Sequence, residues 1–148
     1  MGEFVRDPTH WLRRFSPDEW IRAGLAELGR ARKAAERGDS RAVAAGLKRA
    51  AGMALNGALL VEPEPSWGRT YVEHLEALKI DARVPEAVRA AARDVLEAGA
   101  LGGPRDVVRL RTPKSEHASV EAAHDVIAHA WAVVKRHETD GPAGEGGA

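Results

Sequence analysis

The sequence predicts an all-α protein: an antiparallel bundle of four to five helices, with a docked N-terminal segment and a disordered C-terminal tail. Two observations lead to this fold class. Apolar residues make up 44% of the 148 residues but aromatic residues only 5%, and much of the apolar share is alanine, which loses no side-chain entropy on entering a helix. Apolar residues also recur at helical spacing in several segments, which are separated by stretches containing proline or glycine.

Three parts follow one another along the chain. Residues 16–137 form a single bundle domain, since this length suits one hydrophobic core. Residues 138–148, "ETDGPAGEGGA", have almost nothing to bury, and we expect them to be disordered. Residues 1–15 form an arm, which we expect to dock on its own bundle; packing on a partner subunit is the alternative. The large apolar residues of the arm are Phe4, Trp11, Leu12 and Phe15.

The first helix begins at a recognisable cap. Ser16 can cap it, Pro17 suits its first position, and Glu19 completes a capping box. Gly38 is expected just past its end. Its predicted inward stripe consists of Ile21, Leu25, Leu28, Ala31 and Ala35.

A second helix starts after Asp39 or Ser40 and reaches about Leu60. Its glycines and small residues indicate close contact with another helix, although glycines can also simply be tolerated in a helix. These small residues are Gly52, Ala54, Gly57 and Ala58. The predicted inward residues are Val43, Leu47, Ala50, Ala51, Ala54 and Ala58.

Three more helices complete the bundle. The prolines of "VEPEPSWG", 61–68, end the second helix, and a short amphipathic helix follows over 69–80. A fourth opens at Pro85 and ends at the glycines after 98, and the last runs from about Pro113 to Arg136. Their inward residues are predicted to be Tyr71, Val72, Leu75 and Leu78, then Val88, Ala92, Val95 and Leu96, then Val120, Ala123, Ile127, Ala130, Trp131 and Val134.

Composition excludes several classes of function. Lys+Arg and Asp+Glu both number 22, so nucleic-acid binding would need a local basic patch rather than bulk charge. The absence of cysteine excludes disulfides, thiol catalysis, thiolate zinc sites and iron–sulfur clusters. No signal peptide, membrane span, P-loop, Rossmann fingerprint or nucleophile elbow is present, so we expect a soluble cytoplasmic protein that does not act at a membrane.

The most basic stretch is "GGPRDVVRLRTPK", residues 102–114, which leads into the last helix. Next to a helix N-terminus it would form an anion site for phosphate, a nucleotide or RNA. The alternative is a solvated loop whose arginines pair with nearby glutamates. The candidate anion-binding residues are Arg105, Arg109, Arg111 and Lys114.

Histidines on the last helix raise two further possibilities. Glu121 and His124 have the spacing of ferritin-like metal sites, but no second such motif occurs, so we expect neither a metal nor a cofactor. His117, His124 and Trp131 recur at seven-residue intervals, a stripe more typical of a boundary or dimer surface than of a catalytic site.

The layout of "RARKAAERGDSRAVAAGLKRAAGMALNGALL", "GRTYVEHLEAL" and "HASVEAAHDVIAHAWAVVKR" resembles the HEPN superfamily of small helical domains, over roughly residues 16–137. Active members of that family carry an Arg and a His, with four to six residues between them, near the start of the last helix. The resemblance assigns these catalytic roles to Arg111 and His117. It implies a metal-independent endoribonuclease, usually a dimer in which both copies of the motif meet.

The chemistry suits these residue types, because histidine moves a proton at neutral pH and arginine holds a phosphate through its planar fork. Two residues depart from the family pattern. Thr112 stands where active members often have Asn or Asp, and Pro113 falls inside the motif. Proline disfavours helical angles at Thr112, so Arg111 is expected outside the helix, with Thr112 as the cap and Pro113 as the first helical residue.

The sequence therefore favours a non-catalytic HEPN-like protein that acts through protein–protein contacts or nucleotide and anion binding. The alternative is a metal-independent endoribonuclease, a toxin or defence effector that uses Arg111 and His117. A third possibility is an unrelated helical adaptor. The expected partners are a second copy bound through the last helix, a protein partner (a nucleotidyltransferase-type antitoxin if the chain is a toxin), and RNA or a nucleotide.

Overall fold

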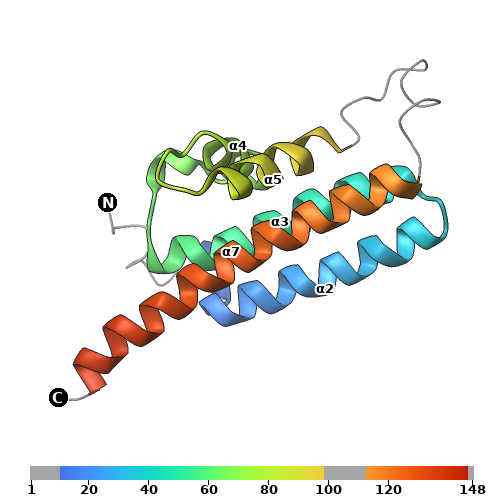
Figure 1. Cartoon of the computed structure of the whole chain (residues 1–148). Helices are drawn as coiled ribbons and strands as arrows, with labels where there is room; N and C mark the ends of the chain where they lie inside the picture. Colours follow the sequence, from blue (N-terminus) through green and yellow to red (C-terminus); the bar gives the residue numbers. More distant parts are fainter. Residues whose placement is uncertain (1–10, 99–112, 147–148) are drawn as a thin grey trace.

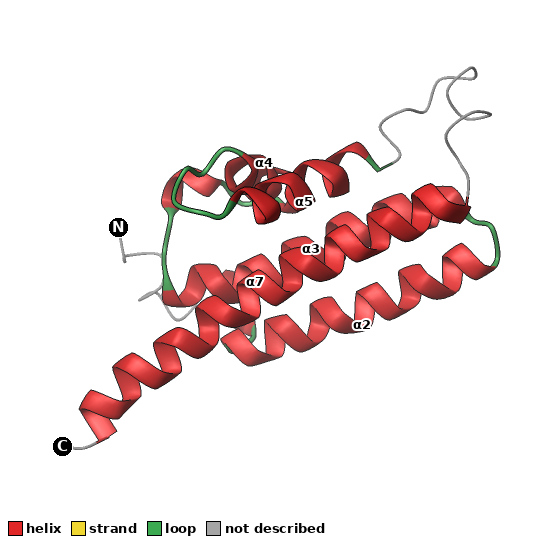
Figure 2. Cartoon of the chain, in the orientation of Figure 1, coloured by secondary structure: helices red, strands yellow, loops and turns green. Residues whose placement is uncertain are grey.

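The computed structural model describes residues 11–98 and 113–146, with side chains at 12, 14–98 and 116–138. The described residues form helices and connecting loops without a strand (Figure 2), so the all-α prediction is confirmed. No helix in this part of the chain is long and apolar enough to cross a membrane. The elements are η1 (Trp11–Arg14), α2 (Pro17–Glu36), α3 (Ser40–Val61), η2 (Pro65–Trp67), α4 (Tyr71–Lys79), α5 (Glu86–Glu97) and α7 (Pro113–Gly146).

The predicted capping residues lie at the ends of the first two helices. Ser16 Oγ accepts from the Glu19 amide at 3.1 Å, and the Glu19 carboxylate accepts from the Ser16 amide at 2.8 Å, which completes the capping box. Gly38 has a φ of 75°, in the left-handed region that favours glycine at a helix end. Asp39 then caps α3 by accepting from the Ala42 amide at 3.1 Å.

Helix α3 lies at the centre of the bundle, with α2, α7, α4 and α5 packed around it (Figure 1). All of its predicted inward residues are buried, and so are Leu55, Asn56 and Leu59, because neighbours cover the helix on nearly every side. Close contact at its small residues is confirmed. A Cβ at Gly52 would overlap the Tyr71 side chain, and one at Gly57 would lie 2.7 Å from the Pro17 carbonyl oxygen.

The described part of the N-terminal arm docks on its own bundle. Leu12 is fully buried, and Trp20 Nε1 donates a 2.8 Å hydrogen bond to its carbonyl oxygen. The Phe15 ring meets the Trp20 ring edge-on, with 4.8 Å between their centres. Phe4 lies outside the described residues.

Helices α4 and α5 pack against each other and cover α3 and α7 (Figure 1). Leu75, Leu78, Ala92 and Val95 are buried as predicted. Val72 is 44% exposed, so its inward placement was wrong. The buried stripe of α4 passes instead through His74, which lies three residues after Tyr71 and four before Leu78. Helix α5 ends at Glu97, and the glycines beyond residue 98 lie outside the described residues.

Helix α7 begins at Pro113, as predicted, and continues past Arg136, the predicted end. Its other inward residues are buried, but Trp131 is 50% exposed, and on α2 Leu25 is 46% exposed; both were predicted to face inward. Each lies at the outer edge of its helix's buried stripe, where none of the described helices covers it. Side chains are described as far as Glu138, so disorder of residues 138–148 stays a prediction.

Candidate functional site

The N-termini of α3 and α7 lie together at one end of the bundle (Figure 1). Ser40 Oγ, at the first residue of α3, donates a 2.5 Å hydrogen bond to Glu116 Oε2 in the first turns of α7. The two helices therefore run parallel, and their positive dipole ends are adjacent. This arrangement favours negative charge, which Asp39 and Glu116 already supply in part.

The predicted catalytic pair is only half described. His117 is exposed in the second turn of α7, next to Glu116. Arg111 lies outside the described residues, as do Arg105 and Arg109; Lys114 is in the first turn of α7, but its side chain is not described. Convergence of Arg111 and His117 on one phosphate therefore stays a prediction.

One edge of the exposed face of α7 lies beside α2 in a defined register. Arg32 pairs with Glu121 at 4.0 Å, and Lys135 pairs with Asp18 at 3.4 Å. The two pairs are equally spaced along both helices, so the helices are antiparallel. This register brings the half-exposed Leu25 to the level of Ala128.

The predicted histidine stripe follows the same surface. His117 is exposed, and the His124 side chain is 50% exposed. Trp131 completes the stripe, and the Lys135 ammonium lies 5.9 Å from its ring centre, within reach of a cation–π contact. Glu121 and His124 remain in solvent, and no group of three or more His, Asp or Glu that could hold a metal occurs among the described residues.

His74 of α4 and Asn56 of α3 form a fully buried polar pair. His74 Nδ1 lies 3.1 Å from the Trp67 carbonyl oxygen, and Nε2 lies 2.8 Å from Asn56 Oδ1. Burial lowers the pKa of His74, so the ring is neutral and carries one N–H. That N–H is on Nδ1, because the Trp67 carbonyl can only accept.

The neutral ring in turn determines how the Asn56 amide is oriented. Nε2 is then an acceptor, so Asn56 must turn its NH₂ toward the ring and donate. In the opposite orientation, Asn56 Nδ2 is buried without a hydrogen-bond partner among the described residues. The pair therefore joins α3, α4 and the loop carrying Trp67 through two directed hydrogen bonds.

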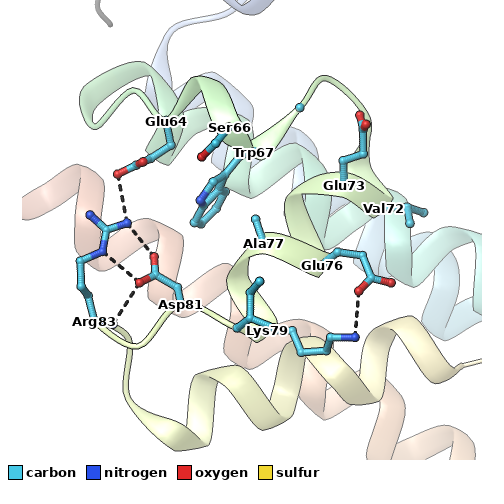
Figure 3. Close-up of a pocket in the computed structure, with 12 residues that line it drawn as sticks. Glu64, Ser66, Trp67, Val72, Glu73, Glu76, Ala77, Lys79, Asp81 and Arg83 are labelled. Atoms are coloured by element: carbon cyan, nitrogen blue, oxygen red, sulfur yellow. Dashed lines mark hydrogen bonds and ion pairs between the residues drawn. The ribbon is translucent and has the colours of Figure 1, made fainter.

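A pocket of about 620 Å³ opens beside this pair, between α4 and the loops that flank it (Figure 3). Trp67, Val72, Ala77 and Ile80 give it an apolar lining, and charged side chains surround it. The figure shows the Trp67 ring between Glu64 and Ala77.

On one side of the pocket, Arg83 pairs with two carboxylates. Its guanidinium donates to both Asp81 oxygens, at 2.9 and 2.8 Å, and lies 3.1 Å from Glu64. These bonds lower the pKa of the Asp81 carboxyl and raise the pKa of the Arg83 guanidinium. On α4, Lys79 pairs with Glu76 at 2.8 Å, and Glu73 caps the helix by accepting from the Arg69 and Thr70 amides.

The buried pair and the pocket were not predicted. His74 could have been found, since Tyr71, His74, Leu75 and Leu78 have the spacing of one helical face. No sequence signal indicates the pocket, because its residues come from η2, α4 and the loop after α4.

Comparison with models of known protein families finds none that matches the chain. Searches of curated proteins and of solved structures likewise find no match. The chain is therefore assigned to an all-helical architecture of five packed α-helices in its described part, without a family.

Proposed function

We propose that the chain is a HEPN-like helical protein of the cytoplasm that does not catalyse a reaction and that works as a homodimer through the exposed face of α7. The observation that carries this proposal is the charge pattern of that face. Glu121 and Asp125 come before Ala128, and Lys135 and Arg136 come after it. All four charged side chains are more than a third exposed, and three of them also have partners within the chain: Glu121 pairs with Arg32, Lys135 with Asp18 and Glu138, and Arg136 with Glu62.

This pattern is complementary to itself. When two α7 helices pair antiparallel about Ala128, Glu121 of each copy faces Lys135 of the other. The small side chain at the centre lets the helices approach closely, and opposite charges fix their register. Trp131 and Leu25, both about half exposed, supply apolar surface beside the contact between the two α7 helices.

A dimer with this centre separates the predicted catalytic histidines. His117 lies eleven positions before Ala128. At a rise of 1.5 Å per residue, the two copies of His117 are roughly 33 Å apart along the pair. A composite ribonuclease site needs the two motifs to meet, so the charge pattern supports the non-catalytic alternative.

The second element of the proposal is an anion site at the start of α7. The adjacent N-termini of α3 and α7 support it, since both favour negative charge. Arg105, Arg109, Arg111 and Lys114 belong to the basic segment that leads into this end. The ligand would be a nucleotide or another phosphate.

The alternative is a metal-independent endoribonuclease that uses Arg111 and His117, with a nucleotidyltransferase-type protein as its antitoxin. One observation favours it: His117 is exposed beside two helix N-termini, where a phosphate of RNA would be stabilised. This function would need a dimer centred near His117 instead of Ala128.

Charge exchange tests the proposed dimer. Glu121 and Lys135 of one copy are about 21 Å apart along α7, so they cannot pair with each other within one chain. We expect Glu121→Lys to weaken self-association at least tenfold in sedimentation equilibrium, and Glu121→Lys with Lys135→Glu to restore most of it. Asp94→Lys, on the exposed side of α5, is the matched control and should leave the dimer intact. A monomeric wild type, or equal dimerisation by all variants, would contradict the proposal.

A further inference from the structure

The pocket beside α4 presents large apolar side chains to solvent. Ile80 is 74% exposed and Val72 44% exposed, and both line the pocket with Trp67. Large apolar side chains that are exposed close together often mark the site where a protein binds a partner, because contact with water is unfavourable for them. The pocket is thus an apolar surface without a covering element among the described residues.

The rim of this pocket has an excess of negative charge. Four carboxylates line it, those of Glu64, Glu73, Glu76 and Asp81, against the two cations Lys79 and Arg83. Lys79 pairs with Glu76, and Arg83 pairs with Glu64 and Asp81. Glu73 accepts from two backbone amides, so two negative charges of the rim remain without a cation. The net charge of the lining is therefore −2, which disfavours an anionic ligand such as a phosphate and favours a cation.

The Trp67 ring gives a cation a specific place. In Figure 3 the ring lies within the pocket, with Glu64 on one side and α4 on the other. Indole is the best aromatic partner for a cation, and carboxylates beside the ring attract the same cation by their charge. Glu73 and Glu76 lie on α4 along the same pocket, and the Glu76 side chain is 52% exposed.

We propose that this pocket binds an arginine or lysine side chain from a basic, apolar-flanked segment of a partner protein, with the Trp67 ring and the rim carboxylates receiving the cationic head. The methylene stem of such a side chain lies on the apolar lining. Ile80 and Val72 contact the apolar neighbours of the basic residue. This inference is independent of the dimer proposed above, because it uses α4 and its loops and not the exposed face of α7.

A partner segment fits better than a free small cation. The volume of about 620 Å³ accommodates more than one side chain, and an ammonium group alone would leave the exposed apolar side chains of Val72 and Ile80 uncovered. Binding through charge at an open rim should also weaken as salt rises.

Isothermal titration calorimetry on the full chain tests the proposal with two peptides. One is acetyl-Leu-Arg-Leu-Arg-Leu-amide, and the other has citrulline at both arginine positions, which keeps the shape and removes the charge. We expect the arginine peptide to bind at least tenfold more tightly than the citrulline peptide. Equal binding, or no heat with the arginine peptide at millimolar concentration, would overturn the proposal.

Surface variants locate the peptide on the protein. Glu76→Lys and Ile80→Ser each change an exposed side chain, so the fold should persist, and circular dichroism verifies this. Both should weaken binding of the arginine peptide at least fivefold. Glu36→Lys makes the same charge change at the far end of α2 and should leave binding unchanged. Equal loss in the Glu36 variant would mean that bulk charge attracts the peptide and would overturn the assignment to this pocket.

Discussion

His74 and Asn56 join α4 to the central helix through a 2.8 Å contact between two side chains with no solvent exposure. A buried hydrogen-bonded pair is directional, so it defines how α4 and the Trp67 loop sit on α3 more narrowly than apolar packing does. The pocket beside α4 depends on that placement.

The first prediction concerns pH. Burial lowers the pKa of His74 in the folded chain below its unfolded value near 6.5. The unfolded state then binds more protons in acid, so stability is complete above about pH 6.5 and falls as the pH drops toward the folded pKa. The slope per buried histidine is at most roughly 1.4 kcal/mol per pH unit. Urea unfolding at pH 7.5 and pH 5 measures it.

A variant at His74 separates the contribution of this residue to the pH dependence of stability from that of other histidines. Burial also lowers the pKa of His129, so His74→Gln should reduce the pH slope without abolishing it. An unchanged slope in His74→Gln would contradict the assignment.

The second prediction concerns the partner of His74. Asn56→Leu leaves the ring nitrogen without a donor and should lower the free energy of unfolding by about 2 kcal/mol. Changing both residues, in Asn56→Leu with His74→Phe, removes the unpaired group and should cost less than the sum of the two single changes. Denaturant melts of the four proteins measure the coupling, and strict additivity would mean that the pair is not a hydrogen-bonded unit.

The third prediction uses two glycines of α2. A Cβ at Gly24 would lie 2.6 Å from the Ala50 carbonyl oxygen, whereas one at Gly29 would meet nothing within 4 Å. Gly24→Ala should therefore destabilise the chain by about 1–3 kcal/mol, because the backbone of α3 must move. Gly29→Ala should stabilise it by about 0.5–1 kcal/mol. Similar effects at both positions would argue against the close approach of α2 and α3.

Much of the fold is predictable because local signals set it. Ser16, Glu19 and Gly38 act on their own backbone neighbourhood, and Pro113 fixes the start of α7 without reference to the rest of the bundle. These boundaries need no knowledge of packing.

Burial is harder to predict, because it depends on how many helices surround a given face. Asn56 is buried because α3 is central, and Leu25 and Trp131 are half exposed because α2 and α7 have an open side. Periodicity gives the direction of a stripe but not its width. The candidate ribonuclease pair rests on the resemblance to a family motif, and its geometry depends on Arg111, which lies outside the described residues.

The fourth prediction concerns catalysis. We expect mixed single-stranded RNA to stay intact when it is incubated with the protein in EDTA, beside His117→Ala as the matched variant. Circular dichroism establishes that both proteins are folded. Cleavage by the wild type but not by the variant would show the metal-independent ribonuclease instead.

Cross-linking of single cysteines tests the central claim, self-association about Ala128, most directly. The chain has no cysteine, so Ala128→Cys and Ala118→Cys each introduce one exposed thiol on α7. A short bis-maleimide crosslinker should join two copies of the Ala128→Cys protein into a covalent dimer and leave the Ala118→Cys protein monomeric. Cross-linking at 118 alone would contradict the account, because that dimer brings the two copies of His117 together.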